Sequence, residues 1–143
     1  MNTWYLAKVK FLAQDEQGNV KRVSSPILVS GINFTEVEAK LIKEMSETVG
    51  GEFKITNISP TKYSDIFDFT EENESVEEEY FFDCKISYLS VTEEKSKKNI
   101  IPVLISATDV KKAEQRLIEC MKPLISDFET ISIKKTNIIS LIK

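Results

Sequence analysis

In the first apolar stretch of the chain, residues suited to a buried face and residues suited to an outward face alternate with a period of two. This period is typical of a β-strand with one buried face, because successive side chains of a strand point to opposite sides. The strand is predicted to start within the first few residues and to reach Phe11. Its two faces are expected to carry Tyr5, Ala7, Val9 and Phe11 on the buried side and Trp4, Leu6, Lys8 and Lys10 on the outward side.

The same pattern returns about 76 residues later, and the register holds through several kinds of element. Aromatic residues, lysines and prolines of the first stretch have a counterpart in the second, and so do positions of the helix and of the closing strand. The matched pairs include Trp4 with Phe81, Lys8 with Lys85, Pro26 with Pro102, Leu41 with Leu117, Met45 with Met121, and Phe53 with Phe128. Such fixed-period similarity identifies an internal duplication. Residues 3–67 and 80–143 are therefore interpreted as two copies of one unit.

Each copy is predicted to be a ββαβ unit. A polar turn follows the first strand, and the second strand is expected to open after Pro26 or Pro102, since proline suits a strand start. Amphipathic helices are predicted over about 34–49 and 110–125. Their apolar stripes are Phe34, Val37, Leu41 and Met45, and Val110, Ala113, Leu117 and Met121.

Local signals suggest where these helices begin and end. Thr35 with Glu38 resembles a capping box, and Asp109 is placed to cap the second helix. The pair at 50–51, Gly-Gly, is expected to end the first helix in a left-handed conformation. An extended stretch closes each copy.

The expected fold class is α+β: a tandem duplication whose antiparallel sheets are each covered by one helix, with the units related by a pseudo-two-fold axis. The predicted organisation is a first repeat over 1–67, an acidic linker over 68–79 and a second repeat over 80–143, packed as one globular unit. A duplicated chain suits repeats of this size, because a core of about 65 residues is marginal by itself.

Composition limits the chemistry. The chain has no histidine, which removes the usual general base, the Ser-His-Asp and Cys-His arrangements and the commonest transition-metal ligand. Cys84 and Cys120 form no CxxC pair and are expected to be free thiols in a reducing, cytoplasmic location. No catalytic residue, cofactor, metal site or membrane association is predicted, and the protein is expected not to be an enzyme.

The outward face of the first strand in each copy is the candidate binding surface. Aromatic side chains interleaved with lysines can stack bases and neutralise phosphates, although the net charge is −4. The alternative is that the same side chains pack the copies together or lie in a dimer interface. The candidate residues are Trp4, Lys8, Lys10, Phe81 and Lys85.

Several of these motifs together resemble an uncharacterised family. They are the aromatic pair before a lysine-bearing strand, Pro26-x-Leu28-Val29, the run from Phe34 to Ala39, and Phe53-x-Ile55. The chain is similar, over essentially its whole length, to a duplicated domain of unknown function found in Bacteroidetes and in phages and mobile elements of gut bacteria. The resemblance implies a phage or intracellular context, in the cytoplasm of a bacterial host cell, and assigns no activity.

The leading hypothesis is a small non-enzymatic binding protein whose target is single-stranded nucleic acid. One alternative is a sponge that sequesters a small nucleotide signal at a seam between copies or protomers, as phage counter-defence proteins do. The other is a protein-interaction or assembly module, in which the outward aromatic side chains are buried between the chains of a homo-oligomer.

Overall fold

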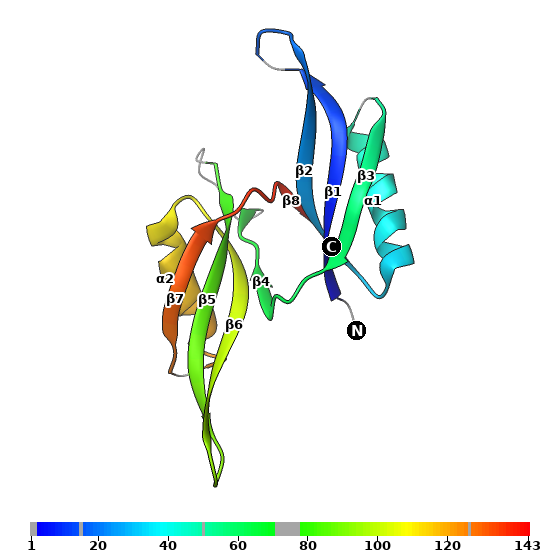
Figure 1. Cartoon of the computed structure of the whole chain (residues 1–143). Helices are drawn as coiled ribbons and strands as arrows, with labels where there is room; N and C mark the ends of the chain where they lie inside the picture. The colour runs from blue at the N-terminus through cyan, green and yellow to red at the C-terminus, as the bar shows by residue number, and fades with distance from the viewer. Residues whose placement is uncertain (1–2, 15, 50, 71–77, 126) are drawn as a thin grey trace. The chain divides into compact units, whose positions relative to one another are not determined.

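The computed structural model describes residues 3–14, 16–49, 51–70, 78–125 and 127–143. The chain divides into two compact units, one formed by Met1–Lys62 with Ile138–Lys143 and the other by Tyr63–Asn137. Each unit holds a four-stranded sheet packed with one helix (Figure 1). The expected α+β class, with one helix on each sheet, is confirmed.

The sheet of the first unit has the strand order β3-β1-β2-β8. Its elements are β1 (Thr3–Gln14), β2 (Val20–Gly31), α1 (Phe34–Thr48), β3 (Phe53–Pro60) and β8 (Ser140–Ile142). Both β2 and β3 pair antiparallel with β1, whereas β8 pairs parallel with β2. The sheet is therefore mixed, and the prediction of a wholly antiparallel sheet was wrong.

The second unit repeats this arrangement with the order β4-β6-β5-β7. It contains β4 (Asp65–Phe67), β5 (Tyr80–Val91), β6 (Ser96–Ala107), α2 (Val110–Met121) and β7 (Glu129–Lys135). Here β4 is the strand that pairs in parallel, with β6. The two units share one topology, as expected for a duplicated chain.

The short parallel strands are exchanged between the sequence repeats. Strand β4 is the last element of the first repeat but lies in the second unit, and β8 is the last element of the second repeat but lies in the first unit. The two junctions match: the amide of Ile139 donates to the Pro26 carbonyl and that of Ser64 to the Pro102 carbonyl, at 3.0 and 2.9 Å. The division into 1–67, 68–79 and 80–143 stays a prediction about the sequence repeats, and the compact units divide the chain differently.

The second strand of each copy begins earlier than predicted, at Val20 and at Ser96, so both prolines lie inside strands. Pro26 pairs with Lys8 of β1, and its carbonyl faces the edge where β8 joins. The side of Pro26 that lacks an N–H faces the same edge, where pairing with β8 starts only at Ile27. Because β2 has no paired neighbour on that side at Pro26, the missing N–H costs no hydrogen bond of the sheet.

One apolar face of each sheet packs against its helix, and the prediction of the inward face of the first strand is confirmed. In the first unit, Ala7 and Val9 of β1 meet the helix residues Val37, Leu41 and Met45. The second unit repeats the contact with Cys84, Ile86, Ala113, Leu117 and Met121. The first residues of the predicted helical stripes do not join the cores: Phe34 and Val110 are both half exposed.

The helix caps differ in part from the prediction. The cap of α1 is Asn33, whose Oδ1 accepts from the Glu36 amide at 2.9 Å, while Glu36 accepts from the Ile32 amide at 3.1 Å. The predicted box at Thr35 was wrong because that residue already lies inside the helix. Asp109 caps α2 as predicted.

Glycine has a conformational role at one described turn. Gly18, in the turn between β1 and β2, has a positive φ of 83°. Gly51 does not adopt the predicted left-handed conformation. Residue 50 lies outside the described residues, as do 15, 126 and 71–77 of the predicted acidic linker.

In the described part of the chain, neither helix is long and apolar enough to cross a bilayer.

Candidate anion-binding site

Lysines gather on the outer face of the first unit's sheet, opposite α1. Lys8 and Lys10 alternate with the buried Ala7 and Val9, so both are exposed on the face away from the helix. Lys10 lies directly opposite Lys54 of β3. On the other side of β1, Arg22 of β2 lies opposite Leu12. Three adjacent strands therefore place cations on one face.

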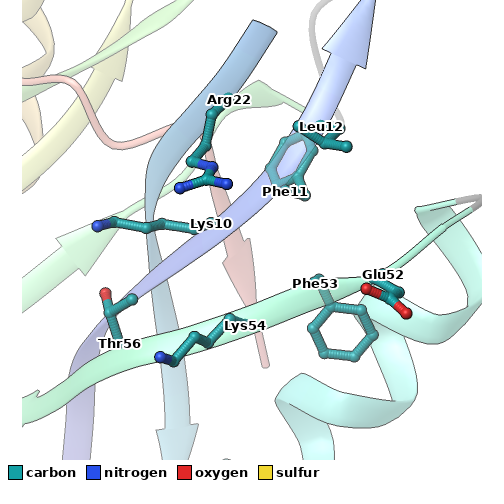
Figure 2. Close-up of a pocket in the computed structure, with 8 residues that line it drawn as sticks. All are labelled: Lys10, Phe11, Leu12, Arg22, Glu52, Phe53, Lys54 and Thr56. Atoms are coloured by element: carbon teal, nitrogen blue, oxygen red, sulfur yellow. The ribbon is translucent and has the colours of Figure 1, made fainter. Parts of the chain in front are cut away.

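Lys10, Lys54 and Arg22 line a cavity of about 360 Å³. Figure 2 shows Lys10, Lys54 and Arg22 extending on the same side of the strands, while the ring of Phe53 turns toward the helix. The lining residues are Lys10, Phe11, Leu12, Arg22, Glu52, Phe53, Lys54 and Thr56. A cavity of this size lies within the range of small-ligand sites.

A β-bulge in the β1–β3 pairing shapes one wall of the cavity. The register shifts between Lys8, which pairs with Asn57, and Val9, which pairs with Ile55. Thr56 is the extra residue, and its hydroxyl donates to the Lys8 carbonyl at 3.2 Å. Bulges twist a strand and redirect its side chains. This one brings Thr56 to the cavity lined by Lys10 and Lys54.

The electrostatics of the cavity favour an anion. Within the described ranges, neither Lys10 nor Lys54 nor Arg22 forms an ion pair, and Glu52 is the one carboxylate among the lining residues. Like charges directly opposite each other on neighbouring strands destabilise a sheet. An anion between Lys10 and Lys54 would relieve that repulsion.

Trp4, the aromatic residue predicted for this surface, lies on the same outer face of β1 and is half-buried. Its carbonyl accepts from both the amide and the hydroxyl of Thr61, each at 2.9 Å. The strand around Trp4 is therefore held in place. Leu6 separates Trp4 from Lys8 along the face, so the indole and the lysines form one line rather than one cluster.

Phe81 and Lys85, the other two predicted residues, belong to the second unit. Phe81 is buried, with 5% of its surface exposed, which fits the packing alternative for this side chain. Lys85 is exposed and lies opposite Pro102 and Ser132, neither of which is charged. The predicted five residues thus fall into two groups on separate units.

Arg22, Lys54 and Thr56 are not among the binding residues predicted from the sequence. A hairpin symmetric about Gln17 would have paired Leu12 with Arg22, but the second strand was expected to start only after Pro26. Lys54 alternates with Phe53 and Ile55, which signals an outward side chain. Its position opposite Lys10 depends on the bulge, and no local pattern specifies a bulge.

The second unit has a cavity of about 320 Å³ at the corresponding place. Ser87 stands where the first unit has Lys10, Lys98 where it has Arg22, and Glu129 where it has Lys54. Leu89 and Phe128 keep the character of Leu12 and Phe53. The lining residues are Ser87, Tyr88, Leu89, Lys98, Asp127, Phe128 and Glu129. This cavity has lost the opposed lysines.

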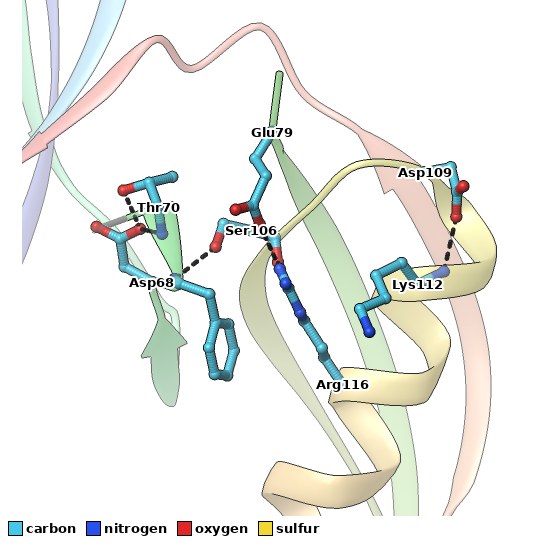
Figure 3. Close-up of polar contacts among 8 residues, drawn as sticks. Asp68, Thr70, Glu79, Ser106, Asp109, Lys112 and Arg116 are labelled. Atoms are coloured by element: carbon cyan, nitrogen blue, oxygen red, sulfur yellow. Dashed lines mark hydrogen bonds and ion pairs between the residues drawn. The ribbon is translucent and has the colours of Figure 1, made fainter. Parts of the chain in front are cut away.

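A polar cluster of the second unit anchors the described ends of the predicted linker (Figure 3). Arg116 of α2 forms an ion pair with Glu79 and donates to the Ser106 carbonyl at 2.7 Å. Its guanidinium also lies 4.6 Å from the centre of the Phe69 ring. Because Phe69 and Glu79 flank residues 71–77, Arg116 holds both ends of that segment to one helix, which is a structural role.

The described thiols do not have the low pKa of a reactive cysteine. Burial, and then the nearby Asp83 carboxylate, raises the pKa of Cys84 to about 12. Burial also raises the pKa of Cys120. Nucleophilic cysteines need the opposite shift, because the thiolate is the reactive form. Across the described ranges, no three His, Cys, Asp or Glu side chains gather as a metal site would require.

Comparison with known families agrees with the resemblance noted in the sequence. A family described as "Domain of unknown function (DUF4494)" matches residues 3–143. A search of curated proteins finds no match. The chain belongs to the DUF4494 family.

Proposed function

We propose that this member of the DUF4494 family binds phosphate groups of single-stranded nucleic acid on the outer face of its first unit. The observation that carries the proposal is the direct pairing of Lys10 with Lys54, beside Arg22, around one cavity. Exposed cations on a sheet face, which form no ion pair with the described part of the chain, supply the electrostatic part of single-strand binding.

The line of side chains along β1 supports an extended ligand. Lys8 and Lys10 are separated by about 6.8 Å along the strand, and Trp4 lies about 14 Å beyond Lys8, from a rise of about 3.4 Å per residue. The half-buried Trp4 offers part of its ring for stacking, which is tolerant of sequence. Because the whole chain carries a net charge of −4, binding depends on this local patch.

A small nucleotide is the second candidate ligand, favoured by the cavity itself. Its volume of about 360 Å³ suits a compact ligand with a phosphate between Lys10 and Lys54 and an apolar group near the exposed Leu12. Both candidates need the same cations. They differ in whether Trp4 and Lys8, outside the cavity lining, contribute to affinity.

The test is fluorescence anisotropy of a labelled single-stranded oligonucleotide against the full chain at low salt. Lys10→Ala with Lys54→Ala should weaken binding at least tenfold and reduce the slope of log K against log salt by about 1.4, since each lost phosphate contact removes about 0.7. The matched control is Lys21→Ala with Lys43→Ala, which removes the same charge from exposed positions of the same unit. Absence of wild-type binding at low salt would refute the nucleic-acid proposal.

The small-nucleotide candidate is tested by thermal unfolding across a nucleotide panel. A ligand present at about a hundred times its Kd stabilises the folded state by about 2.7 kcal/mol. Stabilisation by a mononucleotide that survives Trp4→Ala and Lys8→Ala would favour this candidate over an extended strand. The phage or mobile-element context and the cytoplasmic location stay predictions.

A further inference from the structure

The exchanged strands point to a partner of a different kind from the proposed nucleic-acid ligand. Each unit has an edge that receives a three-residue parallel strand: β2 receives Ser140–Ile142, and β6 receives Asp65–Phe67. In both units the donor strand comes from the other sequence repeat. The reason for this exchange lies in the length of the connection that precedes each donor.

Neither repeat can fill its own edge. The receiving edge lies three strand spacings from β3, about 14 Å away across the sheet. A donor there runs parallel to β3, and a connection between parallel strands of one sheet needs about a dozen residues or more. Only 61–64 separate β3 from β4, and only 136–139 separate β7 from β8.

Hydrogen bonds shorten these connections further. Thr61 still bonds to the Trp4 carbonyl, and Thr136 bonds to the Phe81 carbonyl at 2.9 Å, so each threonine prolongs the edge strand before it. Only three residues, 62–64 and 137–139, then lie between each threonine and its donor strand. Such a segment cannot cross three strands and reverse its course, so the donor strand must leave its own sheet.

The two donors are chemically alike, and so are the two edges. Ile66 lies opposite Leu104, and Leu141 lies opposite Leu28, in the same register relative to the edge. The next donor residues, Phe67 and Ile142, pack into the helix-side cores. The receiving segments are Ile27-Leu28-Val29 and Val103-Leu104-Ile105, all buried. Nothing in these contacts distinguishes a donor on the same chain from one on another copy.

We propose that the edge of β2 is a docking site for the terminal strand of a second copy of this chain, so that two chains can exchange β8. A closed exchange keeps every strand contact that the single chain makes. The balance therefore depends on the chain concentration relative to the effective concentration of the tethered strand, which is in the millimolar range for short linkers. Dimers should accumulate when chains refold together at comparable concentrations.

The experiment traps the donor of one full chain on the edge of another. One chain carries Leu28→Cys and the other Leu141→Cys, both with Cys120→Ser, because positions 28 and 141 pair directly and Cys84 is buried. Paired strands lie about 4.8 Å apart, within the range that a disulfide spans. The chains are unfolded together, refolded at about 0.01 and about 1 mM, and oxidised.

The expected result is a disulfide-linked dimer of the two different chains that is at least tenfold more abundant at the higher concentration. The matched control replaces the first chain by one with Leu124→Cys, an exposed position outside the strands. The double variant Leu28→Cys/Leu141→Cys shows whether the disulfide can close within one chain. If it does close, mixed dimers that are no more abundant than in the Leu124→Cys control overturn the proposal. If this disulfide does not close, the oligomeric state of the refolded wild type is measured by sedimentation. A monomer at both concentrations then overturns the proposal.

Discussion

The two cavities occupy the same place in the two units but differ in charge. In the first unit Lys10 and Lys54 oppose each other, whereas the second unit has Ser87 and Glu129 at these positions. The residues around them follow the same trend: Ser24 and Thr56 of the first unit correspond to Ile100 and Ile131 in the second, all four exposed. One outer face is cationic and polar, and the other is more apolar and acidic.

The cores beneath these faces did not diverge in this way. Leu41 and Leu117 are both fully buried and occupy the same helical position, as do Met45 and Met121. Close packing penalises a change of even one methylene group in a core, whereas an exposed side chain can change without loss of stability. The two copies therefore share the same core packing and differ in the charge and polarity of their outer faces.

The largest expected effect tests whether the two cores are equivalent. Leu41→Ala and Leu117→Ala should each lower the free energy of unfolding of the unit concerned by about 2–5 kcal/mol, because each leaves a cavity beneath its sheet. Chemical denaturation followed by hydrogen exchange measures the loss unit by unit. The comparison fails if one of the two substitutions costs less than about 1 kcal/mol, below the usual range for a buried leucine.

The next effect tests whether the lysine pair alone accounts for the expected difference in oligonucleotide binding between the two cavities. Ser87→Lys with Glu129→Lys in the second unit should create a second oligonucleotide site and raise the binding stoichiometry from one to two. Affinity at the new site should rise at least tenfold, about 1.4 kcal/mol. Isothermal titration calorimetry at low salt gives both quantities.

The control for this graft places the same charge change elsewhere on the second unit. Ser96→Lys with Glu114→Lys alters exposed positions outside the cavity lining and should leave the stoichiometry at one. An equal gain from the control would mean that net charge, rather than the opposed pair, governs binding.

A smaller effect concerns the helix caps. Asn33→Ala and Asp109→Ala should each cost about 1 kcal/mol of stability, since each leaves a helix amide without its acceptor. Thr35→Ala, at the position that the sequence suggested, is the control and should cost less. Denaturant midpoints of the three variants measure the difference, and a larger loss from Thr35→Ala would contradict the observed cap.

The smallest effect, up to about pH 9, is a pH dependence of the second unit, where Cys84 stands in place of Ala7. The pKa of Cys84 is raised to about 12 in the folded state, above its ordinary value near 9. The unfolded chain therefore loses this proton first, and stability present below pH 9 falls as the pH rises, by at most about 1.4 kcal/mol per pH unit. Cys84→Ala should flatten this fall between about pH 8 and pH 10.

The window stops near pH 10 because Tyr63, whose pKa burial and then Asp83 raise to about 12, contributes above its ordinary value of 10. Unfolding followed by fluorescence at several pH values compares the wild type with the variant. Parallel curves would show that Cys84 does not titrate differently in the two states.

Much of the fold could be predicted because it depends on local periodicity. The alternation from Tyr5 to Phe11 identified the inward face of β1, and the helical spacing of Leu41 and Met45 identified the face of α1 that packs on it. The predicted start of the second strand was wrong, because Pro26 was interpreted as a strand start. Its missing N–H only requires that this side of the strand be unpaired. Lys8 and Lys10 were correctly placed on the outer face, but their partners Arg22 and Lys54 come from neighbouring strands and depend on register.

The duplication, the kinds of element and the buried face of each first strand can be read from the sequence, because they depend on composition and spacing within a few residues. Which sheet receives β4 and β8, and which residue lies opposite Lys10, follows only from the three-dimensional fold. Both depend on contacts between distant segments: a four-residue connection too short to cross its own sheet, and a bulge that shifts one strand against another. The repeat that looks self-contained in the sequence is completed by the terminal strand of the other repeat.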